Sequence, residues 1–177
     1  MKKPLPRLVF VVARARNGVI GNRGAMPWRI KSEMALFKRL TMGKPCLMGR
    51  KTWEGLYVKP LPGRPCLVLT RDPGFAAEGA EAFSSFADML TRAHHIADET
   101  GAEEVAVIGG ATLFDLALPH AQRMYLTEID AEPPGDVIFP PFNEALWTER
   151  ESETGGGAAG EPVWRLRVLD RIQEPAV

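Results

Sequence analysis

The residue of greatest chemical interest is an acid on an apolar helix face. The segment 32–40 has helical spacing, and Ile30, Glu33 and Phe37 fall on one stripe. A carboxylate in that position is costly unless something pairs with it. The pattern therefore raises two alternatives: Glu33 faces a polar ligand, or it complements the helix dipole in the first turn behind a cap supplied by Ser32.

Basic and hydroxyl residues follow two expected strands. The run GRKT, residues 49–52, ends the apolar run 45–49, and Thr70 and Arg71 end the run 66–70. Ligands of open α/β sheets lie outside the carboxyl ends of the strands, and a strand-to-helix turn presents free N–H groups that suit a phosphate. A phosphate site is one interpretation, and solvated cations behind a Thr52 helix cap are the other.

Two further motifs allow more than one interpretation. Gly109 and Gly110 end the apolar run 104–109, where paired glycines let a ligand lie against the main chain, although the full GxGxxG spacing is absent and a tight turn explains them equally well. Arg64 lies in a proline-rich turn, either as a surface cation or as a bidentate clamp for a carboxylate.

These residues need a scaffold, and short apolar runs alternating with helix-like segments predict an α/β fold with a mainly parallel sheet. Strands are expected over residues 8–13, 45–49, 66–70, 104–109 and 124–130, with a final antiparallel pair over 147–153 and 163–169. Helices are expected over residues 32–40, 52–56, 85–99 and 112–118. The glycine-rich stretch 154–162 is expected to close the last hairpin as a mobile loop.

Composition limits the classes of protein that remain. A chain of 177 residues predicts a single domain over residues 1–177. Lys and Arg number 22, as do Asp and Glu, which gives no electrostatic footprint for nucleic acid or a membrane surface. We expect no signal peptide, no membrane span and no metal site. Cys46 and Cys66 are expected as buried strand thiols, which favours the cytoplasm, and a monomer is the default.

Seven motifs in order resemble the dihydrofolate reductase family over nearly the whole chain. They are FVVARARNGVIGNRGAMPW, LFKRL, MGRKTWEGL, LPGR, LVLTRDPG, VIGGATLF and YLTEIDAE. The resemblance implies a single α/β domain with a mainly parallel eight-stranded sheet. It also implies reduction of dihydrofolate to tetrahydrofolate with NADPH, and antifolate inhibitors as further ligands.

The resemblance implies a substrate site around Glu33, whose carboxylate would meet the pterin donors and assist protonation of the ring nitrogen, directly or through water. Thr127 would hydrogen-bond this carboxylate and a bridging water, Trp28 would order water nearby, and Met26 would belong to a loop that closes over the nicotinamide. The remaining implied contacts are Val11, Val12, Met34, Leu36, Phe37, Leu56 and Ile108 around the rings, and Arg64 with Lys38 at the carboxylate tail.

The implied cofactor is NADPH, because several positive groups would face the adenosine 2′-phosphate. Ala13 and Ile20 would contact the nicotinamide, and Gly109 and Gly110 the pyrophosphate. The remaining implied cofactor residues are Gly49, Arg50, Lys51 and Thr52 at the phosphates, Leu69, Thr70 and Arg71 at the adenosine end, and Ile108, Ala111, Thr112, Leu113 and Phe114.

The sequence departs from the familiar bacterial pattern at three places. Glu33 stands where many bacterial members have aspartate, so sensitivity to bacterial-type antifolates does not follow. Phe114 replaces a tyrosine and removes a hydroxyl near the nicotinamide. The stretch LYVKPLPGR carries an extra residue, which is expected to reshape the pocket rim near Val58.

Two alternatives on the same fold remain open. The pyrimidine reductase of riboflavin synthesis would keep the NADPH residues, and Glu33, LFKRL and Arg64 argue against it. A non-catalytic folate- or nucleotide-binding protein would keep the fold without turnover, and the retained acid argues against that. A kinase phosphate loop at GKPCLMGRKT fails on spacing.

Overall fold

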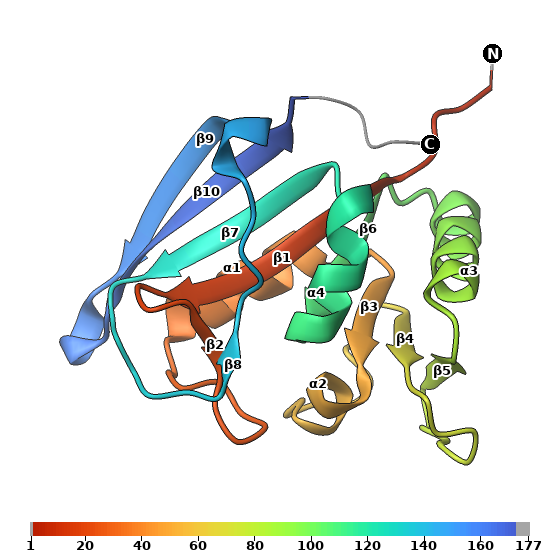
Figure 1. The fold of residues 1–177 in the computed structure, drawn as a ribbon, viewed down its shortest axis with the longest axis horizontal. Helices are drawn as coiled ribbons and strands as arrows, with labels where there is room; N and C mark the ends of the chain where they lie inside the picture. Colours follow the sequence, from red (N-terminus) through yellow and green to blue (C-terminus); the bar gives the residue numbers. More distant parts are fainter. Residues whose placement is uncertain (1, 173–177) are drawn as a thin grey trace.

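The computed structural model describes residues 2–172, and its centre is one eight-stranded sheet (Figure 1). The sheet order is β5-β4-β3-β6-β1-β7-β10-β9. Its strands are β1 (Arg7–Ala15), β3 (Cys46–Gly49), β4 (Cys66–Leu69), β5 (Ala80–Phe83), β6 (Glu104–Gly109), β7 (Arg123–Ile129), β9 (Trp147–Gly156) and β10 (Val163–Arg171). The pairings from β5 to β7 are parallel and β10 is antiparallel to both neighbours, so the expected mainly parallel sheet with a C-terminal hairpin is confirmed.

Helices cover both faces of the sheet (Figure 1). They are α1 (Lys31–Thr41), α2 (Arg50–Glu54), α3 (Phe86–Thr100) and α4 (Ala111–Ala117), with short 3-10 turns at residues 118–120, 144–146 and 158–160. Buried residues of α3 and α4 pack with one face of the central strands, and residues of α1 and α2 pack with the other. This arrangement explains why the central strands read as continuous apolar runs.

Strand alternation assigns the β1 side chains to the two faces. Phe10 and Val12 join the core cluster that contains α3 and α4, whereas Val9 and Val11 join the cluster that contains Trp53 of α2. Successive residues of a strand point to opposite faces, so this division follows directly from the period of two.

Several expected element boundaries were wrong. Helix α2 begins at Arg50, with Gly49 as its N-cap, so Thr52 lies inside the helix and does not cap it. Helix α1 has Ile30 at its N-cap position without a side-chain cap, and Ser32 instead accepts a hydrogen bond of 2.9 Å from the indole of Trp164. The cap interpretation of this helix start therefore fails.

Three short strands were not predicted. They are β5 at the sheet edge and a two-stranded ribbon of β2 (Val19–Gly21) with β8 (Val137–Ile138). Runs of two to four residues carry too little periodicity to be recognised. The glycine-rich stretch connects β9 to β10, as expected, but residues 154–156 extend β9, so the connection is residues 157–162 with the 3-10 turn at residues 158–160.

Both cysteines are buried and free, in neighbouring strands, as expected. Burial raises the pKa of the Cys46 thiol to about 12, which keeps it in the unreactive protonated form. Within residues 2–172, no helix combines the length and apolar character needed to cross a bilayer.

Candidate active site

The parallel strands bring the expected site residues to one edge of the sheet. Thr127 of β7 is level with Ala13 of β1. Gly109 of β6 pairs with Met48 of β3, one residue before Gly49. Residues far apart in sequence thus meet at the carboxyl ends of adjacent strands, where ligands of such sheets bind.

Glu33 lies in the first turn of α1 and is only 5% exposed. Burial raises the pKa of its carboxyl from 4.5 to about 7. A nearby cation or hydrogen-bond donor would lower this pKa, whereas burial raises it by disfavouring the charged form. Glu33 is therefore a buried acid able to hold or release a proton near neutral pH.

Two polar groups from other elements are buried in the same region of the fold. Thr127 is 3% exposed on β7. Trp28 precedes α1 and packs against the core cluster of Ile30 and Leu36. Its indole Nε1 is a buried donor with no acceptor among the described residues. Such a donor indicates a place for an ordered water or a ligand acceptor.

Glycines lie at the carboxyl ends of β3 and β6. Gly109 has a φ of 127°, which L-residues with side chains rarely adopt. A Cβ placed on Gly109 or Gly110 would lie 3.5 or 3.6 Å from the Thr52 hydroxyl, and one on Gly49 would lie 3.8 Å from the Gly110 nitrogen. Gly49, Thr52, Gly109 and Gly110 therefore lie close together, and this group is called the cradle; a strand-to-helix turn of this kind suits a phosphate.

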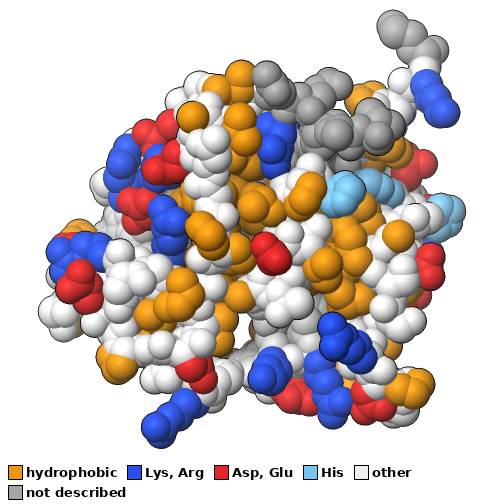
Figure 2. Space-filling model, in the orientation of Figure 1, with side chains coloured by type: hydrophobic (Ala, Val, Ile, Leu, Met, Phe, Trp, Pro, Cys, Tyr) orange, Lys and Arg blue, Asp and Glu red, His pale blue; other side chains and the backbone are white. Residues whose placement is uncertain are grey.

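Charged residues extend this cradle toward β4. Arg50 donates to Glu54 (Nε to Oε1, 2.8 Å) and to Asp72 (Nη1 to Oδ2, 2.9 Å), and its guanidinium lies 4.9 Å from the ring centroid of Phe75. Lys and Arg side chains gather along the lower edge of the molecule in Figure 2, near α2 in Figure 1. The Thr70 hydroxyl accepts the Asp72 N–H at 3.2 Å and helps to order the turn beside them.

Arg64 is a positioned cation, 8% exposed. Its Nε donates to the Pro62 carbonyl at 3.0 Å, and its Nη1 donates to the Thr41 hydroxyl at 3.1 Å. That hydroxyl donates in turn to the Phe37 carbonyl at 2.8 Å. Both acceptors of Arg64 are neutral, so its charge remains for a ligand carboxylate. The role of Thr41 was not expected from the sequence.

Four expected contact residues instead have side chains in the core. Val12 faces the α3–α4 side, opposite Val11, because neighbouring strand residues alternate. Leu36 packs against β7 and β10. Leu113 and Phe114 are buried, and the Phe114 ring packs at a tilt of 53° against the Phe10 ring, with a centroid distance of 4.9 Å. These four side chains belong to the core beneath the site residues, and their burial disfavours direct contact with a ligand.

Apart from Val11, Glu33, Arg64, Gly109 and Thr127, which are buried, the other expected residues keep exposed surface, which leaves them available to ligands. Phe37, Leu56 and Ile108 are half-buried and pack on the same cluster as Val11. Ala13, Ile20, Trp28, Gly49, Thr52, Leu69, Thr70, Gly110 and Ala111 are also half-buried, whereas Met26, Met34, Lys38, Arg50, Lys51, Arg71 and Thr112 are exposed.

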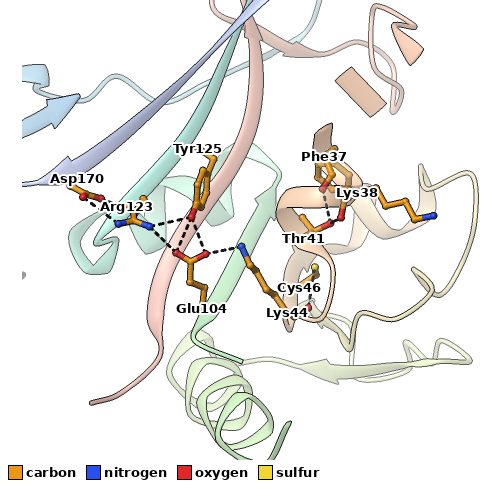
Figure 3. Close-up of polar contacts among 9 residues, drawn as sticks. All are labelled: Phe37, Lys38, Thr41, Lys44, Cys46, Glu104, Arg123, Tyr125 and Asp170. Atoms are coloured by element: carbon orange, nitrogen blue, oxygen red, sulfur yellow. Dashed lines mark hydrogen bonds and ion pairs between the residues drawn. The ribbon is translucent and has the colours of Figure 1, made fainter. Parts of the chain in front are cut away.

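A second polar region lies at the opposite edge of the sheet. A cavity of about 370 Å³ opens at the amino ends of β1, β6 and β7, and its lining includes Lys44, Glu104, Arg123 and Tyr125. Figure 3 shows Glu104 between these partners, with Lys44 Nζ at 2.7 Å and the Tyr125 hydroxyl at 3.0 Å. Arg123 is paired with Asp170 at 2.6 Å. The charges neutralise one another, so this region joins strands and is separate from the candidate active site.

Comparisons with known proteins agree with this geometry. A sequence model of the family "Dihydrofolate reductase" matches residues 7–163. A dihydrofolate reductase of Neisseria meningitidis serogroup A is 41% identical over 145 residues, 82% of this chain and 86% of the relative. Dihydrofolate reductase type 3 of Salmonella typhimurium is 40% identical over 145 residues, 82% of this chain and 85% of the relative.

A solved structure extends the agreement to three dimensions. Dihydrofolate reductase from Enterococcus faecalis, complexed with NADP(H) and RAB-propyl, aligns with a TM-score of 0.84 at 29% identity. The alignment covers 94% of this chain and 97% of that one. Family model, sequence relatives and fold all agree, and the chain belongs to the dihydrofolate reductase family.

Proposed function

We propose that this chain catalyses the NADPH-dependent reduction of dihydrofolate to tetrahydrofolate. The observation that carries the proposal is Glu33, a buried acid whose pKa is raised to about 7 at the carboxyl edge of the sheet. Reduction of an imine needs a hydride at carbon and a proton at the neighbouring nitrogen, and an acid with a pKa near the working pH is suited to assist that proton transfer. Family membership supports the same reaction.

In this proposal Glu33 accepts hydrogen bonds from the pterin amino group and ring nitrogen. Those donors replace the solvent that the carboxylate loses on burial. The Thr127 hydroxyl and the unpaired Trp28 Nε1 hold a water that carries the proton toward the imine nitrogen. Glu33 raises the basicity of the ring nitrogen or organises this water, and the proton itself comes from solvent through the water.

The cradle fits the phosphates of NADPH, which supplies the hydride when it is bound. Gly109 and Gly110 would lie against the pyrophosphate, and Thr52 would donate to a phosphate oxygen. Thr70 and Arg71, at the end of β4, would meet the adenosine 2′-phosphate. The positive charge of Arg71 favours NADPH over NADH, whereas Arg50 is already paired with Glu54 and Asp72.

The substrate tail fits the other end of the site. Arg64 is held by Thr41 and Pro62 with its charge unneutralised, which suits a bidentate contact with a carboxylate. Phe37 and Leu56 line the apolar path between Arg64 and Glu33, with Met34 and Lys38 at the rim. Antifolates with a similar ring would bind here too.

We further propose a cytoplasmic monomer with one domain. The single eight-stranded sheet with helices on both faces supports one domain, and the two free buried thiols support a reducing compartment. Size-exclusion chromatography with light scattering tests the monomer directly.

The test of function is the loss of NADPH absorbance when dihydrofolate is added to the purified protein. NADH and a pyrimidine substrate of riboflavin synthesis serve as controls. Rapid oxidation that requires both NADPH and dihydrofolate is expected. NADPH binding without dihydrofolate-dependent oxidation would contradict the proposal and favour a binding protein, and oxidation with the pyrimidine alone would favour the other reductase.

A further inference from the structure

The turn at residues 22–25 fixes the direction of one carbonyl group. Asn22 and Ala25 exchange two backbone hydrogen bonds of 2.8 and 3.0 Å. The central residues Arg23 and Gly24 have φ values of 49° and 79°, the signs that a type I′ turn requires. The Arg23 N–H also donates to Asp136 Oδ1 at 3.1 Å. The Gly24 carbonyl therefore points in a defined direction at the tip of the loop that carries Met26.

The Gly24 carbonyl lies directly against Gly55, the residue after α2. Its φ of −82° and ψ of −6° lie in the right-handed region that any residue adopts. A Cβ placed on Gly55 would nevertheless lie 2.5 Å from the Gly24 oxygen, a distance that real Cβ atoms do not reach. Glycine is required here for close approach of the turn, and its conformational freedom is not the reason.

The receiving segment is anchored to α2. The Gly55 N–H donates to the Lys51 carbonyl at 3.0 Å. Lys59 Nζ donates to the Glu54 carbonyl at 2.9 Å and ties the following residues back to the end of the helix. The turn thus meets a fixed surface.

A second contact joins the other end of the loop to the same surface. The Arg29 guanidinium lies over the Tyr57 ring, 6.0 Å from its centroid, within the range of a cation–π attraction. Gly24 and Arg29 flank Met26 and Trp28 in the sequence. The loop is therefore fastened at both ends, and the residues expected to cover the reacting groups lie between the fastenings.

We propose that residues 55–57 form a docking surface for the loop of residues 22–29, and that Gly55 and Tyr57 are positioning residues for Met26 and Trp28. This inference rests on the proposed function, because the loop matters only if the site it covers performs hydride transfer. Displacement of the loop exposes the reacting groups to water and disturbs their alignment, and a displacement near 1 Å costs up to about 100-fold in rate.

Gly55→Ala is the direct test. The added methyl must displace the Gly24 carbonyl, because the backbone conformation itself accepts alanine without strain. We expect hydride transfer in a single turnover to fall by about tenfold to 100-fold, with a faster release of NADPH and a nearly unchanged KM for dihydrofolate. In the ligand-free protein, amide exchange of residues 22–29 should accelerate while the melting temperature stays close to that of the unaltered protein.

Tyr57 supplies a matched pair of variants. Tyr57→Leu removes the ring under Arg29, and Tyr57→Phe keeps it. We expect Tyr57→Leu to accelerate amide exchange of the loop and to slow hydride transfer by roughly twofold to fivefold, since an exposed cation–π contact is weak. Tyr57→Phe should behave like the unaltered protein in both measurements.

The outcomes separate the inference from the proposed function. If the unaltered protein does not reduce dihydrofolate, the proposed function fails and this inference fails with it. If the unaltered protein is active and Gly55→Ala keeps its hydride-transfer rate and its loop exchange within twofold, the docking surface alone is refuted. A loss of rate explained fully by a smaller folded fraction, with normal loop exchange, would also refute it.

Discussion

Glu33→Gln removes the ionisable group from the buried site while keeping the size of the side chain. In the folded protein, burial raises the pKa of Glu33 from 4.5 to about 7. The folded state therefore binds more protons than the unfolded state between these values, and the free energy of unfolding falls as the pH rises through this window. The difference, about 7 minus 4.5, corresponds to roughly 3 kcal/mol at full ionisation.

Glutamine does not ionise, so Glu33→Gln avoids the free-energy cost of a buried charged carboxylate at high pH. We therefore expect the stability of the variant, relative to the unaltered protein, to increase by up to about 3 kcal/mol between about pH 4 and pH 8.5. Urea unfolding of the ligand-free proteins, followed by tryptophan fluorescence across this range, measures the change, and other titrating groups cancel in the comparison. A stability difference independent of pH would refute the claim that burial of this carboxyl controls its ionisation.

Three further variants test three separate regions: the expected 2′-phosphate contact, the support of Arg64, and the charge cluster at the amino ends of the strands. Arg71→Ala should weaken NADPH binding by about tenfold while barely affecting NADH, in fluorescence titrations, because it removes one charge-assisted phosphate contact. Thr41→Val removes the acceptor that holds Arg64, so steady-state kinetics should show the KM for dihydrofolate raised by roughly threefold to tenfold and that for NADPH unchanged. Glu104→Gln breaks the paired charges at the amino ends of the strands and should cost about 3 kcal/mol in urea unfolding, with activity per folded molecule retained. Equal effects on both coenzymes, an unchanged KM for dihydrofolate, or loss of activity without loss of stability would contradict these three expectations in turn.

Much of the fold was predictable because buried parallel strands carry a strong local signal. The runs LVFVVA and EVAVIG have the apolar, β-branched composition that burial on both faces demands, and they form β1 and β6 as expected. The edge strand AEAF lacks this signal because none of its residues is fully buried, and its pairing with β4 depends on the tertiary fold.

The start of α2 shows a different kind of error. Thr52 is a good cap residue, so the sequence favoured a helix beginning there. The chain instead enters the helix directly from β3 through Gly49, which has no side chain to cap with. Thr52 is then free to face the glycines of the cradle.

The sequence predicted the chemically important residue of the candidate site, but not the contacts that hold the site residues in place. Glu33 stood out because an acid on an apolar stripe is costly. The contacts of Arg64 with Thr41, and of Gly24 with Gly55, join segments distant in sequence. No local pattern encodes such contacts, because they depend on how α1 and α2 approach the loops beside them.

Single-turnover oxidation of NADPH by dihydrofolate, measured as a function of pH in the unaltered protein and in Glu33→Gln, tests the role of Glu33. We expect the rate in the unaltered protein to fall as the pH rises above about 7, in keeping with the raised pKa of Glu33. In Glu33→Gln we expect a much slower rate at neutral pH with nearly intact NADPH affinity. Equal rates for the two proteins across the pH range would remove Glu33 from the mechanism.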